Sequence, residues 1–221
     1  MGEKREVQWY EIVDSPPTEP FEALVEIYYQ LNGYITSSNK WFWFWNEKKQ
    51  QRGYQDIDIL AIKDKETLIV SVTTNLDDKI NLIDKKDKQN KLRESFERAE
   101  RYLREVEKYR WLVEGNRDVK WILAFAHGYR KSGNLEKVKS KLKNEKIELL
   151  GPKGYIIDKI KKWVCYYHRE LKCENRNKKD ENKKHRGYKT NNQLIKLIEL
   201  MIRMEIEEGR CEKHKNAAAG I

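Results

Sequence analysis

The sequence is poor in cysteine, proline and glycine, and it contains no long apolar segment. Its 221 residues include three cysteines, four prolines and eleven glycines. Such a sparse, odd set of cysteines provides no disulfide framework, which favours a reducing compartment. The apolar run from Trp121 to Ala126 is far shorter than the roughly 20 residues that a membrane-spanning helix needs. These absences predict an intracellular, cytoplasmic protein without a membrane segment.

Charged residues are abundant, and basic ones predominate. The chain has 46 Lys and Arg against 36 Asp and Glu, a formal net charge of +10. The segment 159–189 alone carries eight of these ten positive charges, whereas the residues before it are close to neutral. A concentrated positive charge of this kind favours a polyanion as partner. The segment is interpreted either as a mobile arm that grips DNA or as a solvated linker.

Hydrophobic periodicity predicts an α/β domain with the element order αβββαβαβα. A first helix begins after the cap residue Thr18 and ends at Gly33. The further expected elements are strands over 34–45, 54–62 and 67–74, one long helix over 82–112, a central strand over 119–126, a helix over 135–143, a strand over 146–150 and a helix over 155–171. We therefore expect a core over 1–171, a basic linker over 172–190 and an added C-terminal helix with its tail over 191–221.

Acidic side chains occur on two of these elements in positions that allow them to meet. Glu22 lies on the first helix beside its apolar stripe. Asp56 and Asp58 are two residues apart on the second strand, so they are expected to share one face while Ile57, Ile59 and Ala61 share the other. Aspartate is depleted in strand interiors, which makes this pair unusual. A cluster of carboxylates suits Mg²⁺ or Mn²⁺, which can activate water for attack on a phosphodiester.

The order of elements, together with the segments 21–22, 54–62 and 68–74, resembles the restriction-endonuclease-like (PD-(D/E)XK) superfamily, and within it the archaeal Holliday junction resolvases and Mrr-type nucleases. The resemblance implies a mixed sheet flanked by helices, homodimers and metal-dependent cleavage of structured or duplex DNA. It assigns Glu22 and Asp58 as metal ligands. It also allows a source in an archaeal virus, in which case the protein acts in the host cytoplasm.

The third strand departs from the acid-x-lysine pattern of that superfamily. The matching positions are Ser71 and Thr73, which provide neither the acid nor the lysine. Three explanations stay open. The missing groups are replaced, with Asp56 as a ligand and Lys79, Lys85 or Lys86 as the lysine; or the protein binds DNA without cutting it; or the register of this strand differs from the predicted one.

Basic side chains in two regions are candidate DNA contacts. They are Lys48, Lys49 and Arg52 near the tip of the first two strands, and Lys161, Lys162, Lys178, Lys179, Lys183, Lys184 and Arg186 in the basic segment. Between these regions, the aromatic run Trp41–Trp45 is interpreted either as a strand buried on both faces, or a dimer contact, or as a surface that stacks on unpaired bases.

Overall fold

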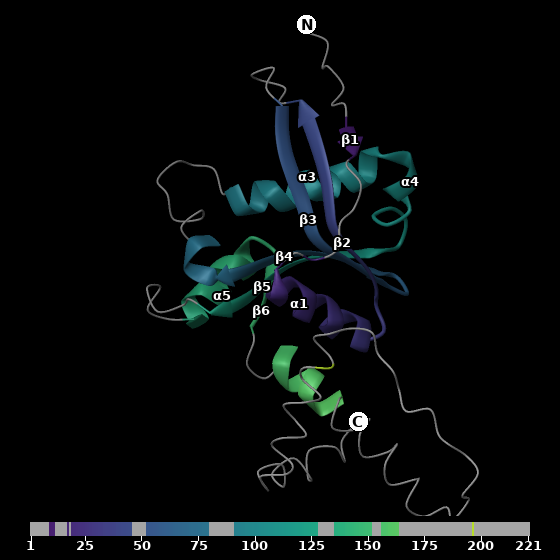
Figure 1. Ribbon diagram of the computed structural model, residues 1–221. Helices are drawn as coiled ribbons and strands as arrows, with labels where there is room; N and C mark the ends of the chain where they lie inside the picture. The colour runs from purple at the N-terminus through teal and green to yellow at the C-terminus, as the bar shows by residue number, and fades with distance from the viewer. Residues whose placement is uncertain are drawn as a thin grey trace, which may run out of the picture. The chain divides into compact units, whose positions relative to one another are not determined.

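The computed structural model describes residues 9–11, 17, 19–45, 52–79, 91–127, 135–151, 156–163 and 196. The chain divides into two compact units, Met1–Pro152 and Lys153–Ile221. The first unit contains a mixed α/β fold, in which helices flank a mixed sheet (Figure 1). The α/β class predicted from the sequence is therefore confirmed.

Within the described residues, the sheet has six strands that lie side by side in the order of the sequence. They are β1 (Trp9–Glu11), β2 (Ile35–Trp45), β3 (Arg52–Lys63), β4 (Glu66–Asn75), β5 (Asp118–His127) and β6 (Ile147–Leu150). Successive strands from β1 to β4 pair antiparallel, β5 pairs parallel with β4, and β6 pairs parallel with β5. The apolar run in β5 is buried from Ile122 to Phe125, as expected for a strand covered on both faces.

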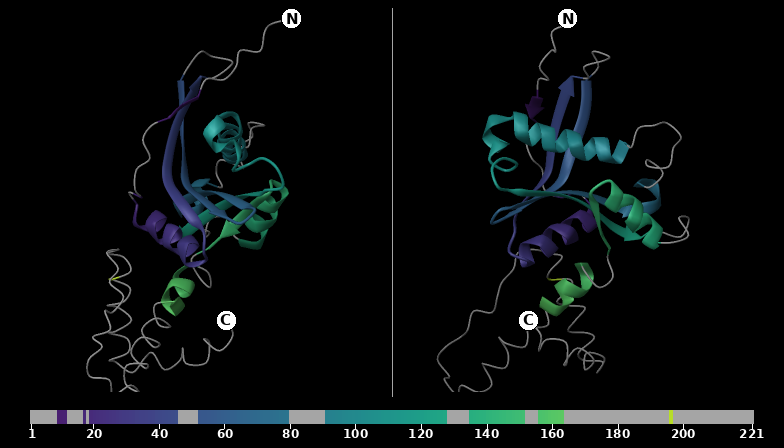
Figure 2. Two further views of the ribbon diagram at one scale, coloured as in Figure 1. Left: turned by 90° about the vertical axis from the view of Figure 1, so that its right-hand side faces the viewer. Right: turned by 180° about the vertical axis from the view of Figure 1, so that it is seen from behind.

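Helices cover both faces of this sheet. They are α1 (Pro20–Leu31), α3 (Lys91–Glu105), α4 (Glu107–Arg110) and α5 (Leu135–Asn144), and residues 76–79 form a further helical turn after β4. Figure 2 shows α1 on one side of the β2–β3 pair and α3 across the other side. On the α3 side, the rings of Phe42 and Tyr102 stack with centroids 4.1 Å apart.

The first helix begins and ends close to the predicted positions. Its N-cap is Glu19, which makes no side-chain capping bond, so the prediction of Thr18 as the cap is wrong. Pro20 occupies the first turn, where its missing N–H has no helical partner to lose. Gly33 follows the helix with φ 83°, a left-handed conformation that glycine adopts without a steric penalty.

Two elements differ from the sequence prediction. The single long helix expected up to residue 112 ends at Glu105, because Val106 is extended (φ −83°, ψ 113°) and a separate short helix follows. Tyr109 in that short helix turns back to the sheet, where its hydroxyl accepts a hydrogen bond from Lys40 Nζ at 3.1 Å. Strand β1 was not predicted, because three residues are too few to show an alternating pattern.

In the second unit, the structure describes a helical segment over 156–163, in which Ile156 and Ile160 are buried. The linker 172–190 and the helix expected after residue 191 lie outside the described residues, apart from residue 196. None of the helices in the described ranges is long and apolar enough to cross a membrane.

Candidate functional site where strands β3 and β4 diverge

The candidate site lies at the point where β3 separates from β4. The two strands pair from Lys63↔Glu66 to Ile59↔Val70, whereas β3 continues to pair with β2 as far as Arg52. Asp58 is the first residue beyond the last β3–β4 pair. Its Oδ2 accepts a hydrogen bond of 2.5 Å from the backbone N–H of Val72. The Val72 N–H is thus bound by a side-chain carboxylate and not by a backbone carbonyl of β3, at the point where the two strands separate.

The backbone opposite Asp58 is unusual. Asn39 on β2 lies between the partners Ser38↔Ile59 and Lys40↔Ile57, and its own pair with Asp58 is missing from the ladder. Asn39 is 5% exposed and has φ 46°, a left-handed conformation that is rare inside a strand. Asparagine tolerates this conformation better than most residues do. Sequence reasoning missed Asn39, although an asparagine inside a strand is itself a signal.

The side chains of β2 change faces at this position. Thr36 contacts α1, where it hydrogen-bonds Glu26 (3.0 Å) and Gln30 (2.9 Å). Phe42, which an uninterrupted alternation would place on the same face as Thr36, packs instead against Tyr102 of α3. The left-handed residue between them accounts for the change.

Strand β3 changes faces in the same way. Ile57 and Leu60 belong to the hydrophobic cluster that includes α3 and α5, whereas Ile59 and Ala61 are equally buried but outside it. The prediction that Ile57, Ile59 and Ala61 share one face is therefore wrong, because the alternation shifts beside Asp58. The shift divides the sheet into two parts. The pairs from Lys40↔Ile57 to Trp45↔Arg52 form an outer arm, and the remaining pairs form the inner part.

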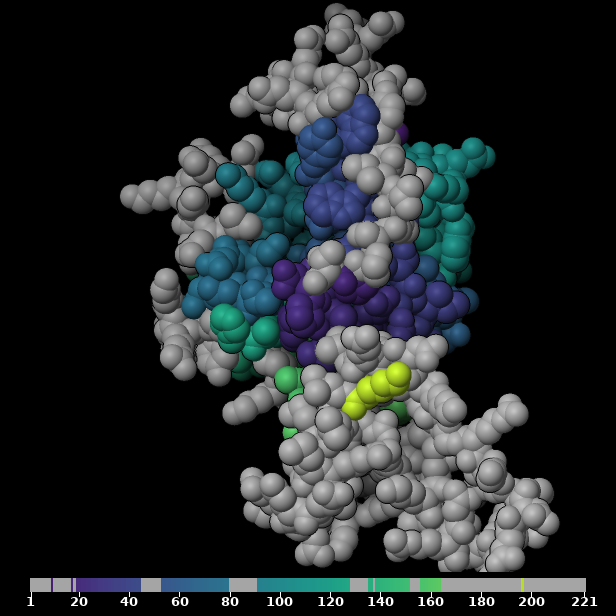
Figure 3. Space-filling model, in the orientation of Figure 1, coloured from purple at the N-terminus to yellow at the C-terminus, as the bar shows by residue number. Residues whose placement is uncertain are grey.

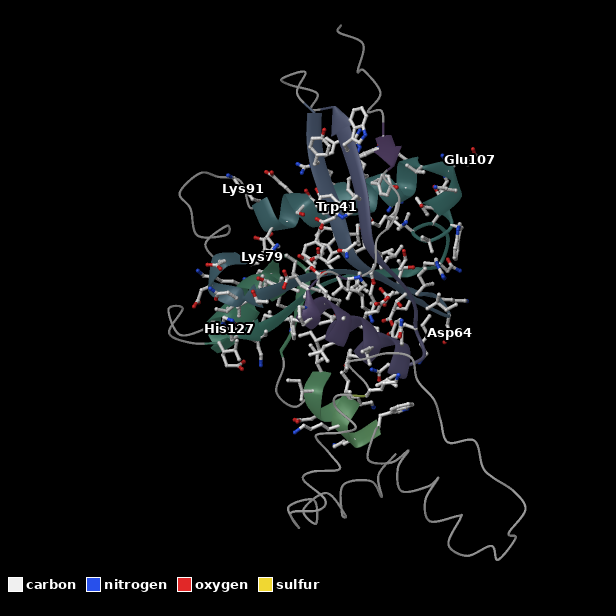
Figure 4. All side chains as sticks on the ribbon, viewed as in Figure 1. Trp41, Asp64, Lys79, Lys91, Glu107 and His127 are labelled. Atoms are coloured by element: carbon white, nitrogen blue, oxygen red, sulfur yellow. The ribbon has the colours of Figure 1, made fainter. Side chains whose placement is uncertain are left out.

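Asp58 lies among charged groups from three different elements. Burial, and next the carboxylate of Asp56, raise the pKa of Asp58 to about 7. The hydrogen bond from Val72 and the ammonium group of Lys79 lower this pKa, and the carboxylate of Glu22 raises it. The structure thus brings the predicted residues Glu22, Asp56 and Lys79 within electrostatic reach of Asp58. Figure 4 labels Lys79, in the helical turn that follows β4.

An open pocket of about 300 Å³ lies beside this cluster, between the start of α1 and the end of β4. It is lined by Glu19, Phe21, Glu22, Val72, Thr73 and Thr74. Ser71, one of the two positions matched to the acid-x-lysine pattern, does not line it. Thr73 does, but its hydroxyl donates a hydrogen bond to the backbone oxygen of Asn75 (3.0 Å). The residues that β4 contributes to the pocket therefore include neither an acid nor a lysine.

The donor atoms fit a weakly held Mg²⁺ or Mn²⁺ better than a tightly caged metal. Among the described residues, no group of three or more His, Cys, Asp or Glu side chains could hold a metal ion. Mg²⁺ commonly binds through one or two carboxylates and keeps several waters. Asp58 Oδ1 accepts no hydrogen bond from a described residue, and the Glu22 carboxylate acts electrostatically on Asp58. These oxygens are the hard ligands such an ion prefers.

Several predicted site residues lie outside the described part of the chain. They are Lys85, Lys86, Lys48, Lys49, Lys178, Lys179, Lys183, Lys184 and Arg186. The backbone of Arg52 begins β3, but its side chain is not described. Lys161 and Lys162 lie on the helical segment of the second unit, where Lys162 is exposed.

Comparisons with known proteins do not assign a family. No family model matches this chain, and no curated protein matches it. Among solved structures, the chain is similar to the crystal structure of protein VC1899 from Vibrio cholerae, with a TM-score of 0.33 and 12% sequence identity over 59% of this chain. The matched part covers 28% of that protein's chain.

Proposed function

We propose that this protein binds DNA and hydrolyses phosphodiester bonds at the Asp58 site with the help of Mg²⁺ or Mn²⁺. Glu22 and Asp58 hold the ion, Asp56 supplements their charge, and Lys79 contacts the phosphate or the attacking water. The observation that carries the proposal is Asp58 itself, a partly buried carboxylate among other carboxylates at a strand opening. Such a site gains most from a bound cation.

The arrangement of elements supports a restriction-endonuclease-like topology. An antiparallel β2–β3–β4 meander follows α1, and a crossover through α3 leads to the parallel strand β5. This order and the position of Asp58 agree with the superfamily resemblance in the sequence. A net charge of +10 supports a polyanionic partner, and the two-fold symmetry of duplex and four-way DNA favours a homodimer.

The residues of the site have different roles in the proposed reaction. The Val72 N–H fixes one oxygen of Asp58, so the second oxygen keeps a defined direction towards a ligand. A bound divalent ion would polarise the phosphodiester and lower the pKa of an attacking water. Lys79 adds a positive charge that acts on Asp58 and would favour an anionic phosphate beside three carboxylates.

A second candidate function is DNA binding without cleavage. The observation that favours it is the pocket face of β4, where Val72, Thr73 and Thr74 provide no acid and no lysine. In that case the carboxylates would be neutralised by a proton or by Lys79.

Cleavage assays with matched variants separate the two functions. Purified protein is incubated with branched, nicked, single-stranded and linear DNA, with and without Mg²⁺ or Mn²⁺. Asp58→Asn is the test variant, because asparagine can still accept the Val72 hydrogen bond. Asp64→Asn is the control, because Asp64 lies in the exposed β3–β4 turn with φ 46°, which asparagine tolerates.

We expect metal-dependent cleavage by the wild type and by Asp64→Asn, and none by Asp58→Asn. The same ions should raise the melting temperature of the wild type but not of Asp58→Asn. Binding without cleavage on every substrate, and no difference between the wild type and Asp58→Asn, would establish the non-cutting function instead.

A further inference from the structure

The outer arm has two faces that differ in exposure. Phe42 is fully buried against α3, while Trp41 is 38% exposed and Tyr54 is 62% exposed. The aromatic run is thus not buried on both faces, as one interpretation of the sequence had it. Figure 3 shows the arm and α1 side by side on one face of the molecule, and Figure 4 labels Trp41 on the arm.

The register of the arm brings together the exposed Trp41 and Tyr54 and the half-buried Trp43. Trp43 pairs with Tyr54, and Trp41 pairs with Asp56. Directly opposite residues of an antiparallel pair project from the same face. Trp41, Trp43 and Tyr54 therefore form one aromatic stripe on the face opposite α3, and Asp56 lies at its inner end.

This stripe leads directly to the candidate site. Asp56 acts electrostatically on Asp58, two residues further along β3. From Tyr54 to Asp58, the strand spans roughly 13 Å at about 3.3 Å per residue. At the outer end, the segment between β2 and β3 carries Lys48 and Lys49, and Arg52 begins β3.

We propose that this stripe, Trp41, Trp43 and Tyr54, is a stacking surface for the unpaired bases of single-stranded DNA. Aromatic rings beside a basic groove are the combination that binds single strands without sequence preference. Bases inside a duplex cannot reach such rings, so the surface selects single-stranded ends, gaps or flaps. The proposal rests on the proposed function for its substrate class, because the stripe would lead a single strand to Asp58.

The alternative occupant of an exposed aromatic face is a second copy of the chain. The charge of the chain favours DNA, because two copies that meet would each bring a net charge of +10. A polyanion complements that charge.

Binding is measured by fluorescence anisotropy in EDTA, where no cleavage occurs, with labelled oligothymidylate and with a blunt duplex of equal length. Tyr54→Ala is the first variant, because its exposed side chain can be removed with little effect on folding. Trp41→Ala and Trp41→Phe follow, the latter keeping a ring. Trp111→Ala is the control, because Trp111 is 59% exposed on the turn after α4.

We expect the wild type to bind the oligothymidylate more tightly than the duplex. Tyr54→Ala and Trp41→Ala should each weaken this binding by roughly fivefold to a hundredfold, the loss of one stacked base. Trp41→Phe should keep most of the affinity, and Trp111→Ala should bind as the wild type does. Irradiated 5-bromodeoxyuridine oligonucleotides should crosslink to the stripe, a readout that needs no variant.

Three results would overturn the stacking surface. They are equal affinity for single strand and duplex, unchanged affinity in both alanine variants with crosslinks elsewhere, or dissociation of a dimer by those variants. A preference for oligouridylate RNA over DNA would overturn the assignment to DNA. Cleavage by Asp58 could survive each of these results, and stacking could survive a lack of cleavage, so the two proposals fail separately.

Discussion

Two carboxylates at opposite ends of the β3–β4 pair, Asp58 and Glu66, differ in how their charges are compensated. At the closed end, Glu66 Oε1 accepts a hydrogen bond of 2.5 Å from Lys120 Nζ, and its Oε2 accepts one from the Tyr34 hydroxyl. Burial tends to raise the pKa of Glu66, but these two hydrogen bonds lower it. At the open end, burial and Asp56 raise the pKa of Asp58.

The difference separates a structural ion pair from a candidate functional site. Glu66 has a cation and a hydroxyl in place, so its charge is neutralised by the fold itself. Asp58 has one backbone N–H and a more distant lysine against two further carboxylates. Carboxylates that are incompletely compensated, as Asp58 is, are frequent at functional sites. Their charge is neutralised by a bound cation or by a proton.

The largest expected contrast between the two carboxylates is in catalysis. Asp58→Asn should reduce the metal-dependent cleavage rate at least about a hundredfold, since it removes a charge that holds the ion. Glu66→Gln should change the rate less than about threefold, because Glu66 lies at the far end of the strand pair. Single-turnover cleavage rates measure both. Equal losses in the two variants would indicate general destabilisation instead of a site at Asp58.

The next contrast is in stability against pH. The pKa of Asp58 is about 7 in the folded protein and near 4 in the unfolded chain, so the folded state loses stability as the pH rises between these values. Asp58→Asn avoids this loss. Urea titrations should show it about 2–4 kcal/mol more stable than the wild type at pH 8 and nearly equal to it at pH 4.

Glu66→Gln should behave in the opposite way. Its lowered pKa means that the charged pair with Lys120 stabilises the fold above about pH 4.5, and that this stabilisation disappears as the pH falls further. The same titrations should show a loss of about 1 kcal/mol at pH 7. Because Lys120 also contacts Asp118 at 3.2 Å, part of the pairing survives in the variant. A stabilising effect at pH 7 would contradict the contrast.

Asn39 tests whether the backbone at the open end sets the position of Asp58. Asn39→Ala should cost about 1–2 kcal/mol of stability, because alanine is strained at φ 46°. Asn39→Gly should be tolerated at this φ. The cleavage rate should likewise be lower in Asn39→Ala than in Asn39→Gly. If alanine and glycine are equivalent by urea titration and by cleavage rate, the left-handed conformation has no part in the site.

The smallest expected effect concerns Lys79. Its positive charge lowers the pKa of Asp58, so Lys79→Gln should raise this pKa and shift the acidic limb of the pH–rate profile to higher pH. Lys91→Gln, an exposed lysine at the start of α3, is the control. An unshifted profile would remove Lys79 from the site and leave the undescribed Lys85 and Lys86 as the remaining candidates.

The sequence was sufficient to predict most of the described elements and the acids of the site. Helix α1, strands β2 to β5 and helix α5 follow from apolar spacing, and Asp56 and Asp58 stood out because aspartate is uncommon inside strands. The change of faces at Asn39 and Asp58 could not be predicted, because a periodic pattern assumes one alternation along a strand. The break at Val106 could not be predicted either, because the helical pattern of the sequence continues through it.

The central claim is that the Asp58 carboxyl has a raised pKa in the free protein and that a bound cation lowers it. An NMR titration tests this claim most directly. The side-chain carboxyl carbon of Asp58, assigned by comparison with Asp58→Asn, is titrated with and without Mg²⁺. We expect a midpoint near pH 7 without the metal and a clearly lower one with it, while Glu66 titrates below its usual range in both. A midpoint for Asp58 near pH 4, or one that Mg²⁺ does not move, would contradict the account.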